Sequence, residues 1–274
     1  MAGQTLSASG QLPEAPLRNL PQDGVDRPLA GFTRDYRDGE SVERHAHTRA
    51  QLLYATRGVM RIATDTAAFV LPPGRALWMP ARVPHVTAMQ GPVAMRALFL
   101  RADAAAAGPG AVTVLAVSPL LRELVLAACA EPLEWDQAGR GGHITALILD
   151  EIARAPRLPL GLPALRDARL RRLAAGLQAD PAQPLGLEDW ARHCGASPRT
   201  LTRLFREETG MSFGRWRQAL RLAEAAALLA EGVPPARAAA RVGYASAPAF
   251  GAAFRAAFGV TPGSGRTAGG IGDL

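Results

Sequence analysis

A cluster of arginines between residues 197 and 208 has the spacing of a DNA-binding helix face. At about 100° per residue, Leu201, Leu204 and Phe205 lie together on one side of a helix over Ser197–Glu208. The opposite side carries polar residues: Arg199, Thr202, Arg203 and Arg206. Arginine can donate two hydrogen bonds to O6 and N7 of guanine in the major groove. The pattern therefore predicts a helix that buries its apolar side and contacts DNA with the other. The alternative is a solvated face whose arginines pair with neighbouring glutamates.

The segment around this helix is repeated at an offset of 49 residues. The first copy contains Cys194-Gly195-Ala196-Ser197 and the second Gly243-Tyr244-Ala245-Ser246, each followed by apolar residues four and eight positions after the serine. The glycine breaks one helix and the serine is a good N-cap for the next. The repeat therefore predicts two helix-turn-helix motifs. A helix over about Ser212–Ala230, roughly 28 Å long, would hold their second helices about one DNA turn apart.

From about Leu187 to Pro262 the chain resembles the AraC/XylS family of transcriptional regulators. The residues that carry the resemblance are Ala191, Ser197, Leu201, Leu204, Phe205, Gly210, Arg217, Arg221, Ala225, Leu229, Gly243, Tyr244, Phe250, Phe254, Arg255, Phe258, Gly259, Thr261 and Pro262. The resemblance implies that Arg199, Thr202 and Arg203 contact bases of double-stranded promoter DNA. We assign contacts with the DNA backbone to four further residues: Ser197, Arg206, Ser246 and Arg255.

The second motif departs from the family pattern. The positions equivalent to the base-reading ones hold Ala247, Pro248, Ala249 and Ala252, whose side chains donate no hydrogen bond. The closing Pro-x-x-Tyr-Arg of the family has become Pro262-Gly263-Ser264-Gly265-Arg266, without the tyrosine. We therefore expect the second motif to hold the DNA backbone and to contact bases through methyl groups at most.

Three of the five histidines lie in two short motifs nearer the N-terminus. The first motif is Gly39-x5-His45-x-His47-x3-Gln51-x6-Gly58, and the second is Gly74-x5-Pro80-x4-His85. They resemble the two motifs of the cupin barrel, with Gln51 where glutamate is usual and Arg82 where glycine is usual. In metal-binding cupins these positions converge on one divalent ion, so the resemblance implies a shared site for His45, His47, Gln51 and His85. Because side chains alternate along a strand, His45 and His47 point to the same face.

Two interpretations of this site remain open. Three neutral imidazoles favour zinc, nickel, cobalt, iron or copper over magnesium or calcium, and a glutamine in place of glutamate weakens the site. The alternative is a metal-free barrel in which the same histidines line the pocket of a small-molecule effector. A third interpretation, a metal-dependent cupin enzyme, fits poorly with a fused DNA-binding domain, and we expect no enzymatic activity.

Charge is concentrated in the C-terminal part of the chain. Residues 166–274 carry 15 arginines against 9 acidic residues, whereas residues 1–165 carry 16 against 15, and the chain contains no lysine. This excess is the electrostatic pattern of a polyanion-binding module. Cys129 and Cys194 are too few for a disulfide framework, and no export signal or uninterrupted apolar span is present. The sequence thus predicts a reduced, cytoplasmic, nucleoid-associated protein that contacts no membrane.

The pattern along the chain predicts an α+β protein of two domains. We expect a flexible N-terminus over 1–28, a small antiparallel jelly-roll barrel over 29–115, and coupling or dimerisation helices with a linker over 116–163. An all-α domain with both helix-turn-helix motifs would cover 164–266, and a flexible tail 267–274. The strands expected in the barrel are separated by turns at Arg57-Gly58 and Gly91-Pro92, and the linker is Pro156–Pro163.

Together these features predict a bacterial one-component regulator. Its cupin domain senses a small molecule or a divalent metal, and its helices near 119–154 form a homodimer. The alternative for these helices is that they only pack onto the barrel. Its paired motifs bind promoter DNA, and RNA polymerase is a further partner if it activates transcription. The alternative is an effector-independent regulator whose barrel serves only assembly.

Overall fold

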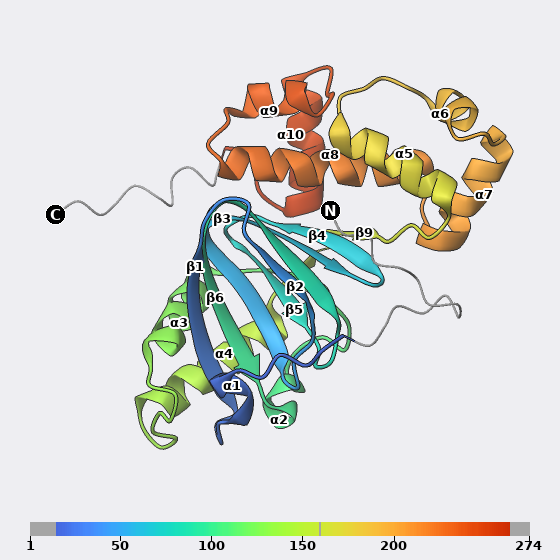
Figure 1. Ribbon diagram of the computed structural model, residues 1–274. Coiled ribbons are helices and arrows are strands. Elements are labelled where there is room, and N and C mark those ends of the chain that lie inside the picture. Colours follow the sequence, from blue (N-terminus) through green and yellow to red (C-terminus); the bar gives the residue numbers. More distant parts are fainter. Residues whose placement is uncertain (1–14, 159, 264–274) are drawn as a thin grey trace.

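The computed structural model describes residues 15–158 and 160–263, in which a part that contains all the strands and four helices precedes an all-helical part (Figure 1). The strands are β1 (Leu29–Tyr36), β2 (Ser41–His45), β3 (Ala50–Thr64), β4 (Ala67–Leu71), β5 (Arg75–Met79), β6 (His85–Leu100), β7 (Thr113–Ala116), β8 (Arg157–Leu158) and β9 (Gly161–Pro163). The helices are α1 (Pro21–Gly24), α2 (Ala102–Ala105), α3 (Pro119–Ala130), α4 (Arg140–Arg154), α5 (Ala168–Ala179), α6 (Leu187–His193), α7 (Pro198–Thr209), α8 (Phe213–Ala230), α9 (Pro235–Arg241) and α10 (Ala247–Phe258). Within the described ranges, every helix is too short or too polar to cross a membrane. The α+β, two-domain prediction is confirmed.

Two long antiparallel strands, β3 and β6, form the centre of the sheet. The sheet order is β1-β6-β3-β5-β7-β8, with β2 beside β6 and β4 between β3 and β9. We expected each long strand to be two shorter ones, but β3 continues through Gly58 with register shifts on both sides of Arg57. A Cβ at Gly58 would lie 2.5 Å from the carbonyl oxygen of Pro92. Gly58 therefore belongs to a β-bulge that bends β3. It does not form a turn that would end the strand.

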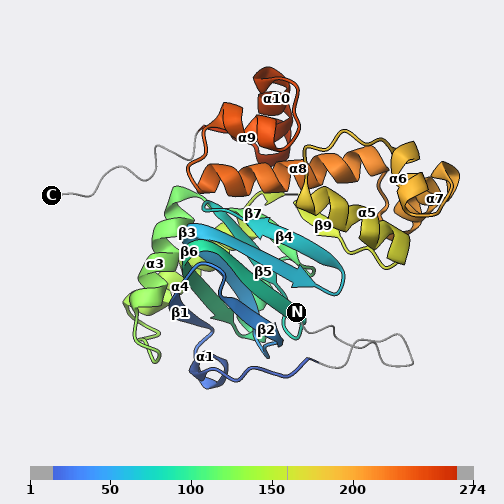
Figure 2. The same cartoon turned by 45° about the horizontal axis from the view of Figure 1, so that its top comes forward.

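Both faces of this sheet are buried, so the central strands are apolar at consecutive positions. Along β3, Leu52 and Tyr54 pack with Leu121, Leu124 and other residues of α3 and α4. The alternate residues of β3 and its neighbours face the barrel interior, among them Leu53, Ala55, Leu77 and Phe99. Figure 2 shows the two helices on the outer side of the sheet, opposite the barrel interior. Most of the apolar surface of α3 and α4 is therefore buried against the barrel.

The segment before β1 differs from the prediction of a flexible N-terminus over 1–28. Residues 1–14 lie outside the described residues, but residues 15–28 are fixed to the barrel. Leu17 forms a parallel bridge with Ala46. The buried guanidinium of Arg49 donates hydrogen bonds to three backbone carbonyl oxygens of this segment, those of Asp23 (3.2 Å), Val25 and Arg27 (2.8 Å). One buried arginine thus donates to three carbonyl oxygens of this segment and holds it on the barrel.

The predicted linker over Pro156–Pro163 also differs, because its described residues belong to the sheet. Strand β8 pairs with β7, and β9 pairs with β4 through Phe69–Gly161 and its neighbours. The backbone N–H of Ala164 then donates to the carbonyl oxygen of Thr66 (2.8 Å). The connection between the halves is therefore hydrogen-bonded on both sides of residue 159. The expected tail over 267–274 lies outside the described residues.

The helical half rests on the barrel through α8 (Figures 1 and 2). Ala223 and Ala227 of α8 pack against Val59 and Val70 of the barrel in a small buried cluster. The Arg75 guanidinium at the start of β5 donates to the carbonyl oxygen of Phe258, at the end of α10 (2.9 Å). The second helix-turn-helix motif is thus held against the sensor at two places.

Candidate functional site

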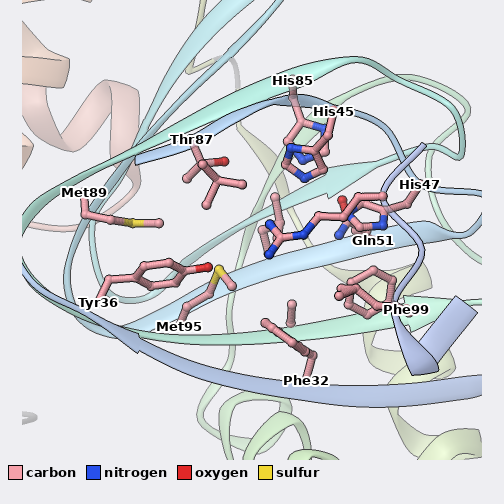
Figure 3. Close-up of a pocket in the computed structure, with 15 residues that line it drawn as sticks. Phe32, Tyr36, His45, His47, Gln51, His85, Thr87, Met89, Met95 and Phe99 are labelled. Carbon is pink, nitrogen blue, oxygen red and sulfur yellow. The ribbon is translucent and has the colours of Figure 1, made fainter. Parts of the chain in front are cut away.

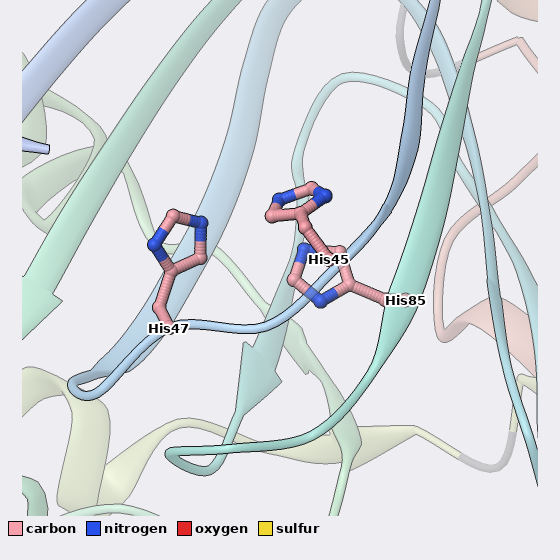
Figure 4. A group of neighbouring side chains, drawn as sticks. All are labelled: His45, His47 and His85. Carbon is pink, nitrogen blue, oxygen red and sulfur yellow. The ribbon is translucent and has the colours of Figure 1, made fainter. Parts of the chain in front are cut away.

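The three motif histidines meet inside the barrel (Figure 4). His45 ends β2 and lies opposite His85, the first residue of β6, while His47 follows β2 in the turn to β3. The ring centroid of His45 lies 4.9 Å from that of His47 and 4.3 Å from that of His85. All three side chains are buried, and their ligand atoms lie within 4.8 Å of one another.

Each imidazole has an oxygen atom beside its Nδ1 atom. His45 Nδ1 lies 2.7 Å from the carbonyl oxygen of Glu43, and His85 Nδ1 lies 3.0 Å from that of Val83. His47 Nδ1 faces a carboxylate oxygen of Asp23 at 3.4 Å. Carbonyl oxygens only accept hydrogen bonds, so the neutral rings of His45 and His85 carry their proton on Nδ1 and their lone pair on Nε2. The His47 ring interacts both with Asp23 and with the Arg18 backbone. A nearby oxygen acceptor on the second nitrogen is the usual support of a metal-binding histidine.

The histidines are held in their neutral form. Burial lowers the pKa of all three imidazoles, and for His85 it lowers the pKa to about 4. The positive charge of Arg18 lowers each pKa further, whereas the Asp23 carboxylate acts in the opposite direction on His47. Neutral imidazole is the form that binds metals, so no proton has to be removed near pH 7.

The rest of the pocket combines polar and apolar side chains (Figure 3). Gln51 of β3 is buried in the same pocket, as the cupin resemblance implies. The interior beyond the histidines is lined by Phe32, Tyr36, Met89, Met95 and Phe99. Sequence reasoning missed Arg18 and Asp23, both from the N-terminal segment that we expected to be flexible. Nothing local marks them, because their position depends on long-range contacts of that segment.

The two helix-turn-helix motifs have the same local construction. The Ser197 hydroxyl accepts a hydrogen bond from the backbone N–H of Thr200 (3.1 Å), and the Ser246 hydroxyl from that of Ala249 (3.3 Å). Helices α7 and α10 each have 12 residues and end at a left-handed glycine, with φ of 68° at Gly210 and 72° at Gly259. The repeat seen in the sequence is thus a repeat of structure.

The predicted base-reading residues lie on the exposed side of α7. Arg199, Thr202 and Arg203 are all exposed, whereas Leu201 and Phe205 are fully buried behind them. The Arg203 guanidinium is paired with Glu207 (2.7 Å), and the Thr202 hydroxyl donates to the Pro198 carbonyl oxygen (2.9 Å). An exposed ion pair of this kind is worth at most about 0.5 kcal/mol, so guanine can displace Glu207 from Arg203. The proposed backbone residues Ser197, Arg206, Ser246 and Arg255 are exposed as well.

The equivalent side of α10 is exposed but apolar. Ala247, Pro248, Ala249 and Ala252 all face solvent, and between Ser246 and Arg255 no side chain carries a polar atom. The two motifs therefore present different chemistry on similar backbones.

Arg221 of α8 fixes the two motifs relative to each other. Its Nε atom donates to the carbonyl oxygen of Pro181 (2.7 Å), in the loop before α6. Its Nη1 atom donates to that of Gly243 (3.1 Å), in the turn before α10. One side chain therefore contacts the first motif, the connecting helix and the second motif together.

Comparisons with known proteins agree with this arrangement. A family model described as an AraC-like ligand binding domain matches residues 29–174, and one described as a helix-turn-helix domain matches residues 190–268. The chain is 30% identical over 219 residues to the HTH-type transcriptional regulator NimR of Escherichia coli, covering 80% of each protein. It is 40% identical over 119 residues to the HTH-type transcriptional regulator RipA of Corynebacterium glutamicum, covering 43% of this chain and 34% of RipA.

Among solved structures, ToxT of Vibrio cholerae, with an unsaturated fatty acid bound, aligns over 90% of this chain and 98% of its own. Its identity is 8% and its TM-score 0.38. The assignment therefore rests on the two family models and on NimR. With a ligand-binding barrel before paired helix-turn-helix motifs, the chain belongs to the AraC family of DNA-binding transcriptional regulators.

Proposed function

We propose that the barrel of this regulator binds one divalent transition metal through Nε2 of His45, His47 and His85, and that the metal controls promoter binding. The observation that carries the proposal is that three buried imidazoles bring their ligand nitrogens within 4.8 Å of one another, with carbonyl oxygens beside Nδ1 of His45 and His85 that leave their Nε2 lone pairs for a metal. Zinc, nickel, cobalt, iron and copper suit such a donor set. Gln51 serves as a weak fourth ligand or holds a water molecule there.

The small volume of the pocket favours an ion over an organic molecule as the ligand. The free volume among the lining residues is about 30 Å³, comparable to the volume of one water molecule in the liquid. The nitrogen atoms, now within 4.8 Å of one another, would have to approach to about 3.4 Å around a tetrahedral ion. The positive charge of Arg18 opposes a cation here, whereas the Asp23 carboxylate beside His47 favours one.

A small organic effector is the second candidate, supported by the apolar side chains that continue the pocket beyond the histidines. An organic molecule would need more room than the pocket has, so the Arg18 side chain and its segment would have to move. Metal-free protein that also fails to bind added metal would favour this candidate.

Assembly and output complete the proposal. The protein acts by binding, not by catalysis, on promoter DNA in the bacterial cytoplasm. It forms a homodimer through α3 and α4, where Leu120 and Leu147 remain about half exposed after the helices have packed on the barrel. Where it activates transcription, RNA polymerase is its further partner.

The experiment measures the metal content of untagged protein by mass spectrometry, before and after dialysis against zinc or nickel. We expect about one ion per chain, none in His47→Ala, and tighter binding in Gln51→Glu because a carboxylate attracts the ion. His193→Ala is the matched control, since this histidine is exposed and distant in sequence from the triad. Equal occupancy in His47→Ala and the native chain would contradict the proposal. DNA binding measured with metal and with chelator then tests control of the promoter.

A further inference from the structure

A second cavity lies in the DNA-binding domain, on the side of α8 away from the barrel. It is lined by Gly214, Arg217, Gln218, Arg221 and Tyr244, and its free volume is about 170 Å³. The α8 residues among these recur at helical spacing, so they share one face of the helix. Ala223 and Ala227, which contact the barrel, lie on a different face. The cavity therefore remains open while the barrel is docked.

Positive charge in this cavity is not balanced by a nearby ion pair. Arg217 donates one hydrogen bond, from Nη1 to the Leu185 carbonyl oxygen (3.0 Å), and its guanidinium lies 5.0 Å from the centre of the Phe213 ring. Arg221 donates only to backbone carbonyl oxygens. Within residues 15–158 and 160–263, neither guanidinium forms an ion pair with a carboxylate. Two adjacent cations without a paired carboxylate attract an anion from outside, although Asp180 lies near enough to Arg221 to offset part of its charge.

The cavity also contains a hydroxyl group whose hydrogen bonding is incomplete. Tyr244 Oη is buried and makes no hydrogen bond of good geometry with the described residues, although the Gln218 side chain lies close enough to interact with it. Leaving a buried polar atom unpaired is destabilising, so such an atom usually has a partner, here one that the isolated chain does not supply. Arg217 has unused N–H groups as well, and the exposed Gln218 amide can donate from the rim.

We propose that this cavity binds a phosphate group, with Arg217, Tyr244 and Gln218 as donors and Arg221 as a fixed second positive charge. Tyr244 lies two residues before Ser246, the N-cap of α10, so the cavity adjoins the end of the helix that approaches DNA. A phosphate of the duplex between the two motifs is one source of the group. A free phosphate-bearing molecule is the other source of the same chemistry.

The test compares Arg217→Gln and Tyr244→Phe with Arg215→Gln in the full-length chain. Arg215 is an exposed arginine of α8 outside the cavity, so its substitution removes the same charge elsewhere. The first arm measures thermal unfolding in sodium phosphate and in sodium chloride of equal ionic strength. Extra stabilisation by phosphate in the native chain and in Arg215→Gln, but not in the other two variants, is the result expected for any phosphate ligand.

The second arm uses an operator selected from random duplexes, with single neutral methylphosphonates between its half-sites. For a DNA phosphate, we expect one or two positions to weaken binding by the native chain roughly tenfold. The same substitutions should have little effect on Tyr244→Phe or Arg217→Gln. Binding by Arg217→Gln, which removes a positive charge, should also depend less steeply on salt, by about one unit of slope.

The two arms together decide the outcome. If only thermal unfolding separates the cavity variants from Arg215→Gln, the ligand is a free phosphate compound. If binding to the methylphosphonate duplexes separates them, the ligand is a phosphate of the DNA. Tyr244→Phe also guards against misfolding, because removing an unpaired hydroxyl should leave the unfolding temperature unchanged or higher. If neither arm separates the cavity variants from Arg215→Gln, the proposal is overturned. The metal measurements on the barrel are independent of both arms.

Discussion

Arg61 of strand β3 and Glu224 of helix α8 form a two-bonded ion pair that joins the barrel to the DNA-binding domain. Nη1 of Arg61 donates to Oε1 of Glu224 (2.8 Å), and Nη2 donates to Oε2 (2.5 Å). Arg61 Nε also donates to Gln90 Oε1 (2.7 Å), and the Gln90 amide donates to Glu231 beyond the end of α8 (2.6 Å). Gln90 belongs to β6, the strand that begins with His85. One strand thus carries both a histidine of the sensor and a contact with the DNA-binding domain.

We expect this ion pair to stabilise the docked arrangement measurably. In a double-mutant cycle with Arg61→Ala and Glu224→Ala, the coupling free energy should be about 1–2 kcal/mol, because the pair is bidentate and partly buried. Urea unfolding of the full chain in the presence of chelator measures it. The control is the exposed pair Asp150–Arg154 of α4, which should give no more than about 0.5 kcal/mol. Equal coupling in the two cycles would show that Arg61 and Glu224 are effectively solvated.

The buried histidines predict that the metal-free protein loses stability in acid. The pKa of His85 is lowered from 6.5 to about 4 in the folded chain, so between these values the unfolded chain binds more protons. The free energy of unfolding is therefore highest above pH 6.5. It falls as the pH decreases toward 4, by up to about 3 kcal/mol. Denaturant unfolding of the native chain and of His85→Gln across this range measures the difference. Parallel stability curves for the two proteins would contradict the assignment of a neutral, buried imidazole.

The two motifs should differ in what they contribute to DNA binding. Arg203→Ala should cost specificity at one or two base pairs, about 1–3 kcal/mol for the preferred base. Arg255→Ala should weaken binding to all sequences nearly equally and reduce the salt slope by about one. Binding of both variants to a panel of single-base operator variants measures this contrast. A uniform loss for Arg203→Ala would show that α7 does not read bases.

The helical domain could be predicted closely because its signals are local. The hydroxyls of Ser197 and Ser246 cap α7 and α10 by accepting a hydrogen bond from the backbone N–H three residues later. The left-handed glycines Gly210 and Gly259 end the same two helices. The predicted reading helix over Ser197–Glu208 differs from α7 by one residue at each end.

The barrel was less predictable because its decisive contacts are distant in sequence. Glycines 58 and 91 resemble turn signals, yet pairing with neighbouring strands carries β3 and β6 past them. Arg49 is one of 31 basic residues, and nothing around it indicates that its guanidinium is buried and holds the N-terminal segment. The resemblance to the cupin motifs implied that the histidines converge, but the oxygens beside Nδ1 of His45 and His85 are backbone carbonyls, which no motif records.

The remaining exposed apolar surface predicts where two chains meet. Leu120 of α3 is 50% exposed and Leu147 of α4 is 48% exposed, whereas Leu121, Leu124 and Ile148 of the same helices are buried against the barrel. Replacing both leucines by glutamate should convert a dimer into a monomer, because two charges would be buried at a symmetric contact. Light scattering should then report the mass of a single 28.8 kDa chain. Leu133→Glu, at a residue 36% exposed between the two helices, should leave the dimer intact. A native chain that is already monomeric at micromolar concentration, or a dimer that survives the double substitution, would rule out this interface.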